Sequence, residues 1–203
     1  MKIQTWGRRL ASMALCAAML CGGTAAASSR FPDVPYDADY ATAVRCLSEL
    51  KVIVGFENGE FRPEDTVTRA QAAVIVCKLK GAAAKAKEQE RKESPFEDVP
   101  DGHWAAGYIA VAERLNMISG YGDGRFGPDD TLTYAQMLSV LINVWGYTDM
   151  AKYSGGWPEG YLAVAREYGL IGNGVDGDAA CPRSAVAQMC YRAMLVDGAS
   201  WVE

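Results

Sequence analysis

The chain has 203 residues, and half of them are apolar, which is enough for one domain or a few small ones with a real core. Its net charge of −5 argues against nucleic acid as a partner, because a face that binds phosphates has to be basic. Neutral and cationic partners remain open, and so do anionic partners that meet a few locally placed arginines.

Residues 1–27 have the layout of a secretory signal peptide. Basic residues precede an apolar run from Leu10 to Cys21, and small residues follow at Ala25 and Ala27. The apolar run is shorter than the about 20 residues that a membrane-spanning helix needs. We therefore expect cleavage after Ala27, export from the cell and no transmembrane segment. A twin-arginine or a lipoprotein signal fits the flanking residues less well.

Four cysteines remain beyond this leader: Cys46, Cys77, Cys181 and Cys190. None forms a CxxC pair and the single histidine is distant from all of them, so we expect neither a zinc site nor another cofactor. An exported protein can form disulfides, which leaves a Cys46–Cys77 bridge open. Small buried thiols on helix faces are the favoured interpretation.

The rest of the chain is a repeat. Residues 31–71 align without a gap on residues 96–136, at a constant offset of 65 positions. A third copy begins at Trp157, which aligns with Trp104 at an offset of 53, and its register slips after Gly177. The pattern predicts a first repeat with a spacer at residues 28–93, a second repeat at 94–152 and a degenerate third repeat at 153–203.

Each repeat predicts two helices. After Phe-x-Asp-Val-Pro, apolar residues recur at helical spacing; in the second copy these are Trp104, Tyr108, Val111, Ala112 and Leu115. A glycine-rich turn follows, and then a second helix that opens with Thr-x-x-Gln, the signature of a capping box. A two-helix face is too small to bury itself, so we expect the three helix–turn–helix units to share one core in an all-α fold. The Ala/Lys/Glu-rich spacer that begins at Gly81 predicts a solvated extension of the preceding helix.

The turn "GYGDGRFGPDD" looks like a ligand site, but its residues do not support that interpretation. It lacks the alternating oxygen ligands and final glutamate of a calcium loop, and it lacks the Lys-Ser/Thr of a phosphate-binding loop. Its Asp-Gly step is a tight-turn signal, and Phe126 and its counterpart Phe61 are expected to fill the core. Asp33 and Asp98 are expected as helix-entry or turn residues.

The segments "FEDVPDGHWA", "GYGDGRFGPDD" and "VTRAQ" together resemble the S-layer homology (SLH) domain family. The resemblance covers nearly the whole chain beyond the leader, in three copies. It implies an all-α, mainly helical, pseudo-threefold bundle shaped like a spindle, with grooves between neighbouring repeats. It also implies non-covalent anchoring to the bacterial cell wall at the cell surface. The implied ligand is a secondary cell-wall polysaccharide that is attached to peptidoglycan and often pyruvylated.

The resemblance further implies which residues would contact the polymer. The motif arginine falls on Arg69 in the first copy and on Arg183 in the third, while the second copy has Tyr134 there. An arginine at the first turn opposes the helix dipole, which favours a functional reason for its presence. For Trp104, a core position and a groove wall are equally open. The full implied set is Arg69, Arg183, Trp104, Trp157, Asp33, Asp98, Gln71 and Gln136.

Two other classes of function compete with anchoring. An enzyme is not expected, because the chain has no GxSxG, Walker A or HExxH motif. A structural or protein-interaction module that has lost polymer binding is the stronger alternative, with another surface protein as its partner. Tyr134, which removes a charge from one groove, and the degenerate third repeat favour that alternative.

Overall fold

The computed structural model describes residues 30–89 and 94–196. The signal peptide predicted for residues 1–27 therefore lies outside the described residues. Within them the chain is helical, with strand pairing limited to three isolated bridges, which confirms the all-α class. None of the helices in this part of the chain is long and apolar enough to cross a membrane.

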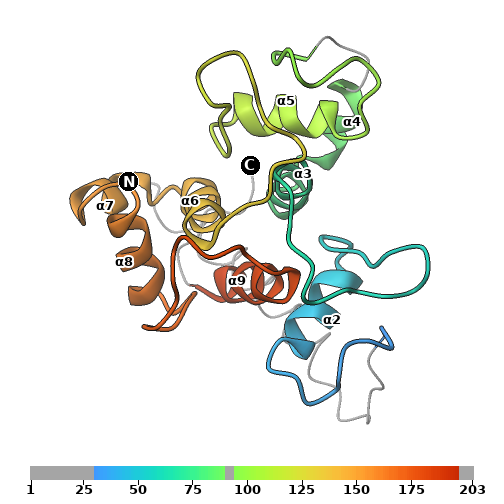
Figure 1. The fold of residues 1–203 in the computed structure, drawn as a ribbon, viewed down its shortest axis with the longest axis vertical. Helices are drawn as coiled ribbons and strands as arrows, with labels where there is room; N and C mark the ends of the chain where they lie inside the picture. The colour runs from blue at the N-terminus through green and yellow to red at the C-terminus, as the bar shows by residue number, and fades with distance from the viewer. Residues whose placement is uncertain (1–29, 90–93, 197–203) are drawn as a thin grey trace, which may run out of the picture.

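Each repeat contributes a first and a second helix. The first helices are α2 (Ala41–Glu49), α5 (Ala106–Arg114) and α8 (Glu159–Glu167), and the second helices are α3 (Arg69–Leu79), α6 (Tyr134–Trp145) and α9 (Arg183–Leu195). Two short helices, α4 (Ala83–Gln89) and α7 (Thr148–Tyr153), lie between the repeats. Figure 1 shows the second helices around the centre and the first helices further out on three arms.

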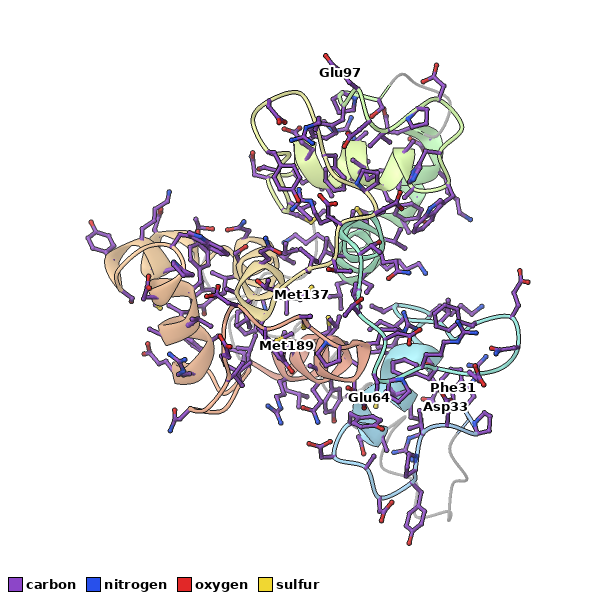
Figure 2. All side chains as sticks on the ribbon, in the orientation of Figure 1. Phe31, Asp33, Glu64, Glu97, Met137 and Met189 are labelled. Carbon is purple, nitrogen blue, oxygen red and sulfur yellow. The ribbon has the colours of Figure 1, made fainter. Side chains whose placement is uncertain are left out.

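The helices that pack together come from consecutive repeats. Helix α5 packs on α3, α8 packs on α6, and α2 packs on α9. The last of these pairs joins the first repeat to the third, so the three repeats form a closed ring. Their buried apolar residues form one cluster, and Figure 2 shows Met137 and Met189 from it near the centre of the molecule. The shared core that the sequence predicts is therefore present.

Each second helix begins at a joint with the loop of another repeat. At the first joint the N–H groups of Arg69 and Ala70 donate to the carbonyls of Asp130 and Pro128, at 2.9 and 3.0 Å. The other joints repeat this pattern: Tyr134 and Ala135 donate to Ala179 and Gly177, and Arg183 and Ser184 donate to Asp65 and Pro63. The N–H groups of a helix's first turn have no partner within the helix. The loop of the other repeat satisfies them and so ties the two repeats together.

Side chains cap two of these helices as the sequence predicts. Thr68 Oγ1 accepts from the N–H of Gln71, and Gln71 Oε1 accepts from the N–H of Thr68, at 3.3 and 3.1 Å. Thr133 and Gln136 form the same capping box at the start of α6. Helix α9 has Pro182 at its N-cap, where no side chain caps the helix.

Each complete repeat clamps its loop to its own leading segment. The Asp33 carboxylate accepts from the N–H groups of Phe61 and Arg62, with a shortest distance of 2.6 Å, and Phe31 packs on Phe61 with ring centroids 5.5 Å apart. Asp98 makes the equivalent clamp in the second repeat. The loop phenylalanines of both repeats are fully buried, which confirms that they fill the core.

The spacer differs from the sequence expectation. It is helical, but α4 is a separate helix and not an extension of α3, because the chain turns at Gly81, which has a φ of +69°. Helix α4 packs on α5 and buries Ala86, so one of its faces belongs to the core rather than to solvent. Residues 90–93 of the spacer lie outside the described residues.

Two members of the apolar set predicted for the second repeat also do not lie in the core. Trp104 precedes α5 and is 58% exposed, and Leu115 follows it and is 44% exposed. The helical spacing of this set is correct for Val111 and Ala112, which are buried, but the helix is shorter than the spacing suggests.

The cysteines do not form the bridge that the sequence left open. Cys77 is a buried free thiol, as are Cys181 and Cys190, which confirms the favoured interpretation for these three. Burial raises the pKa of Cys77 and of Cys181 to about 12. Cys46 is disulfide-bonded, so the expectation of a thiol is wrong at that position.

Candidate functional site

A hollow of ≈ 200 Å³ lies where parts of all three repeats meet. The first repeat supplies the segment 52–56 and one face of α3, the second supplies Trp104, and the third supplies Arg183. We call this hollow the first groove. Its lining residues are Val52, Ile53, Val54, Gly55, Phe56, Gln71, Val74, Ile75, Lys78, Trp104 and Arg183.

Arg183 is the central cation of the first groove. Its Nε donates to the carbonyl of Phe61 at 2.9 Å and one Nη donates to the carbonyl of Val54 at 3.1 Å. Its guanidinium carbon lies 4.8 Å from the ring centroids of both Phe56 and Phe61. Burial lowers the pKa of the guanidinium, which nonetheless stays charged at neutral pH. The position of the arginine is therefore fixed by two carbonyls and two rings of the first repeat.

Arg183 forms no ion pair with a described residue, although Asp65 and Asp33 offset part of the effect of burial on its pKa. Among the described residues no carboxylate forms an ion pair with it, and its second Nη has no protein acceptor. A buried cation without a paired anion is costly unless something else neutralises it. A guanidinium also presents its donors in a planar fork that matches a carboxylate. The groove is therefore suited to an anionic ligand.

The other polar residues of the first groove come from α3 and from the start of α5. Trp104 offers an exposed ring, the kind of surface on which an apolar sugar face packs. Gln71 lends its oxygen to the helix cap, while its amide nitrogen has no partner among the described residues. Lys78 also lines the groove, and sequence reasoning missed it. The spacing of Gln71, Val74 and Lys78 along one face of a helix is the signal that could have found it.

Arg69 makes the same contacts with the loop of the second repeat. Its Nε donates to the carbonyl of Phe126 at 2.7 Å and its Nη donates to the carbonyl of Ser119 at 2.6 Å. Its guanidinium carbon lies 4.6 Å from the centroid of Tyr121 and 4.7 Å from that of Phe126. Trp157 stands two residues before α8, as Trp104 stands before α5, and is 54% exposed. We call this set of residues the second groove, because each holds the position that its counterpart holds in the first groove.

The joint at the start of α6 has neither the arginine nor the loop rings. Val175 stands two residues before Gly177, as Phe126 stands before Pro128, so a valine takes the place of the buried phenylalanine. Residues 172–174 contain no aromatic side chain. Tyr134 packs against the core in place of an arginine, and burial raises the pKa of its hydroxyl. The register slip thus lies inside the third loop, before Val175, rather than after Gly177 as the sequence alignment suggests.

The eight residues implied by the sequence separate into three groups. Arg183, Trp104 and Gln71 meet in the first groove, while Arg69, Trp157 and Gln136 hold the matching positions of the second. Both oxygens of Asp33 and of Asp98 accept N–H groups of their own loops, so these two carboxylates belong to the scaffold. Within residues 30–89 and 94–196 no cluster of His, Cys, Asp or Glu side chains could hold a metal ion.

The comparison with known protein families agrees with this geometry. The sequence model of the S-layer homology domain matches residues 30–73 and 95–138, which contain the two complete repeats. The chain belongs to the S-layer homology family. The third repeat lies outside both matched segments, although it makes the same backbone joint as the other two SLH repeats.

The relatives of this SLH chain are proteins of the bacterial surface. A "Cell surface protein" of Thermoanaerobacter kivui is 38% identical over 146 residues, which cover 72% of this chain and 18% of that protein. A "Cellulosome-anchoring protein" of Acetivibrio thermocellus is 41% identical over 86 residues (42% and 19%), and an "S-layer protein" of Bacillus licheniformis is 30% identical over 134 residues (64% and 15%). The chain spans less than a fifth of the length of each. Their names and the SLH family describe structural proteins rather than enzymes.

Proposed function

We propose that this chain anchors to the bacterial cell envelope by binding a secondary cell-wall polysaccharide non-covalently in the first and second grooves. The observation that carries the proposal is the buried Arg183, held between two rings without a carboxylate partner, in a hollow that also contains the exposed Trp104. The names of the relatives support envelope anchoring in general and a location at the cell surface. Export by the predicted signal peptide fits this location.

The chemistry of the groove fits an acidic sugar. A carboxylate, such as that of a pyruvate ketal, can accept from the free edge of Arg183 while the carbonyls of the first repeat hold the opposite edge. Trp104 can then cover one face of the sugar ring. Because protein groups already fix the guanidinium, little side-chain entropy is lost when the ligand binds. An anionic wall polymer offers this unit many times along one chain.

One specific observation favours a second candidate function. Tyr134 and the third loop contribute no cation and no ring stack, so at least one of the three joints is built for structure alone. A structural or protein-interaction SLH module, with another surface protein as its partner, would follow if the two arginines also served only to hold loops.

Sedimentation with isolated cell-wall sacculi separates these two functions. The mature chain, residues 28–203, is mixed with sacculi that carry their polysaccharide and with sacculi from which it has been removed. We expect pelleting only with the polymer-bearing sacculi. Trp104→Ala should weaken it, because the ring is exposed and its loss should spare the fold. Tyr153→Ala is the matched control, since Tyr153 is 94% exposed and lies on α7, outside the first groove.

The outcomes decide between the candidates. Equal pelleting with stripped and intact sacculi, or none with either, would show that polymer anchoring is wrong and would favour the structural module. Pelleting that depends on the polymer but is unchanged in Trp104→Ala would remove the first groove from the proposal. Arg183→Ala is a poor first test, because the same side chain holds the loop of the first repeat.

A further inference from the structure

The first and second grooves differ in charge at one position of the second helix. Lys78 lines the first groove, and the repeat offset of 65 positions places Asn143 at the corresponding point of α6. The position one turn earlier differs in polarity rather than in charge, with Val74 in α3 and Ser139 in α6. This difference affects binding where the side chains are free to meet a ligand, and Lys78 and Asn143 differ in this respect.

The ammonium of Lys78 is free to meet a ligand. Among the described residues it makes no ion pair and no hydrogen bond, in contrast to Lys152, which pairs with Asp149 at 3.7 Å. Partial burial lowers the pKa of Lys78, and no carboxylate opposes this effect. Lys78 and Arg183 thus place two cations around one hollow of ≈ 200 Å³ without an anion between them.

The corresponding face of the second groove is neutral, and Asn143 and Ser139 each make a hydrogen bond within the protein. Asn143 Oδ1 accepts from the hydroxyl of Thr148 at 2.8 Å, which ties it to the start of α7. Ser139 Oγ donates to the carbonyl of Gln136 at 2.9 Å within its own helix. Helix α6 therefore adds no cation at these two positions, and the buried cation of the second groove is Arg69, from α3.

We propose that Lys78 makes the first groove a two-cation site for a sugar unit that carries two acidic groups, while the second groove takes a unit with one. The first acidic group pairs with the free edge of Arg183 and the second with Lys78. This inference rests on the proposed function and refines it. It assigns the two grooves to differently charged parts of the polymer and makes Lys78 a specificity-determining residue.

Two small probes of equal ring size test the assignment. Methyl glucuronide carries one carboxylate, and its 2-O-sulfate carries a carboxylate and a sulfate. The mature chain is titrated with each by NMR, and the indole N–H signals of Trp104 and Trp157 report the first and the second groove. We expect the sulfated probe to bind at the Trp104 groove about tenfold more tightly than methyl glucuronide, the effect of about one added charge-assisted hydrogen bond. At the Trp157 groove the two probes should differ by less than about threefold.

The variant Lys78→Asn gives the first groove the residue of the second. It should abolish the preference for the sulfated probe at Trp104, while methyl glucuronide should still bind there through Arg183. Lys152→Asn is the matched control, because both lysines lie in the last turn of a helix and lose the same favourable contact with its dipole. Lys78→Arg keeps the positive charge and should therefore retain the preference for the sulfated probe.

The result also distinguishes this inference from the proposed function. Lys78→Asn should still pellet with polymer-bearing sacculi, because Arg183 and the second groove remain. An equal preference for the sulfated probe in wild type and Lys78→Asn would overturn the inference, as would the absence of any preference in wild type. A wild type that pellets with sacculi but shows no shift at Trp104 with either probe would overturn it as well. Failure of wild type to pellet would instead overturn the proposed anchoring.

Discussion

Arg183→Met removes the side chain that links the third repeat to the first and tests the structural half of its role. Methionine keeps much of the length and the apolar contact with Phe56 and Phe61, but it cannot donate to the carbonyls of Phe61 and Val54. Each hydrogen bond from a charged donor contributes about 1.5–3 kcal/mol, and each ring contact about 0.5–2 kcal/mol. The desolvation of the guanidinium and the packing of methionine offset part of this sum.

We expect a net loss of about 2–4 kcal/mol in the free energy of unfolding. For a chain of this size that corresponds to a fall of about 5–10 °C in Tm. Urea unfolding of the mature chain, followed by circular dichroism at 222 nm, measures the loss directly. The m-value should stay constant, because the ring of repeats still unfolds as one unit.

Arg125→Met is the matched control for this experiment. Arg125 lies in the loop of the second repeat and pairs with Asp123 at 2.8 Å, but its side chain is 61% exposed. An exposed ion pair contributes little to stability, so this variant should be nearly as stable as wild type. If Arg183→Met costs no more than Arg125→Met, then Arg183 does not hold the joint, and its burial would have to be explained by ligand binding alone.

Four further substitutions test other parts of the fold. Partial burial opposes the ionisation of Asp98, but the N–H groups of Phe126 and Gly127 outweigh it and lower its pKa. The contribution of Asp98 to stability is therefore present above about pH 4 and is lost as the pH falls through the lowered pKa. Asp98→Asn should flatten the acid limb of a plot of Tm against pH. A Cβ at Gly120 would overlap the ring of Phe96 and the carbonyl of Arg125, so Gly120→Ala should lower the free energy of unfolding by about 1–3 kcal/mol in urea, and an unchanged value would contradict the close packing. Thr133→Ala removes half of a capping box and should cost about 1 kcal/mol in the same assay. Tyr134→Arg should lower Tm and add no third binding event in titrations with methyl glucuronide, because the third loop has no rings to hold a guanidinium; an extra site would refute this.

The sequence predicts the local features of this fold well, because each depends on residues that are close in the chain. The capping boxes, the buried loop phenylalanines and the helical class all follow from short patterns. The packing partners do not, since α2 meets α9 only after the ring has closed. For the same reason the sequence cannot show that Arg183 belongs to a groove of the first repeat, where it binds the carbonyl of Val54 across most of the chain. The position of the register slip in the third loop likewise required the backbone pairing of Gly177.

The comparison of the three joints also changes what the degenerate repeat means. At the joints that begin α3 and α9, an arginine packs on two aromatic rings, and the arginine and the rings stabilise each other. At the joint that begins α6, Tyr134 replaces the arginine and Val175 replaces the buried phenylalanine. A buried charge and the rings that would have held it are thus absent together. A lone arginine there would be a buried cation without support, which is a costly arrangement. The third repeat meanwhile keeps Arg183, the residue on which the first groove depends. We therefore interpret its divergence, which includes its loop and the cap of α9, as sparing the contribution that it makes to its neighbour.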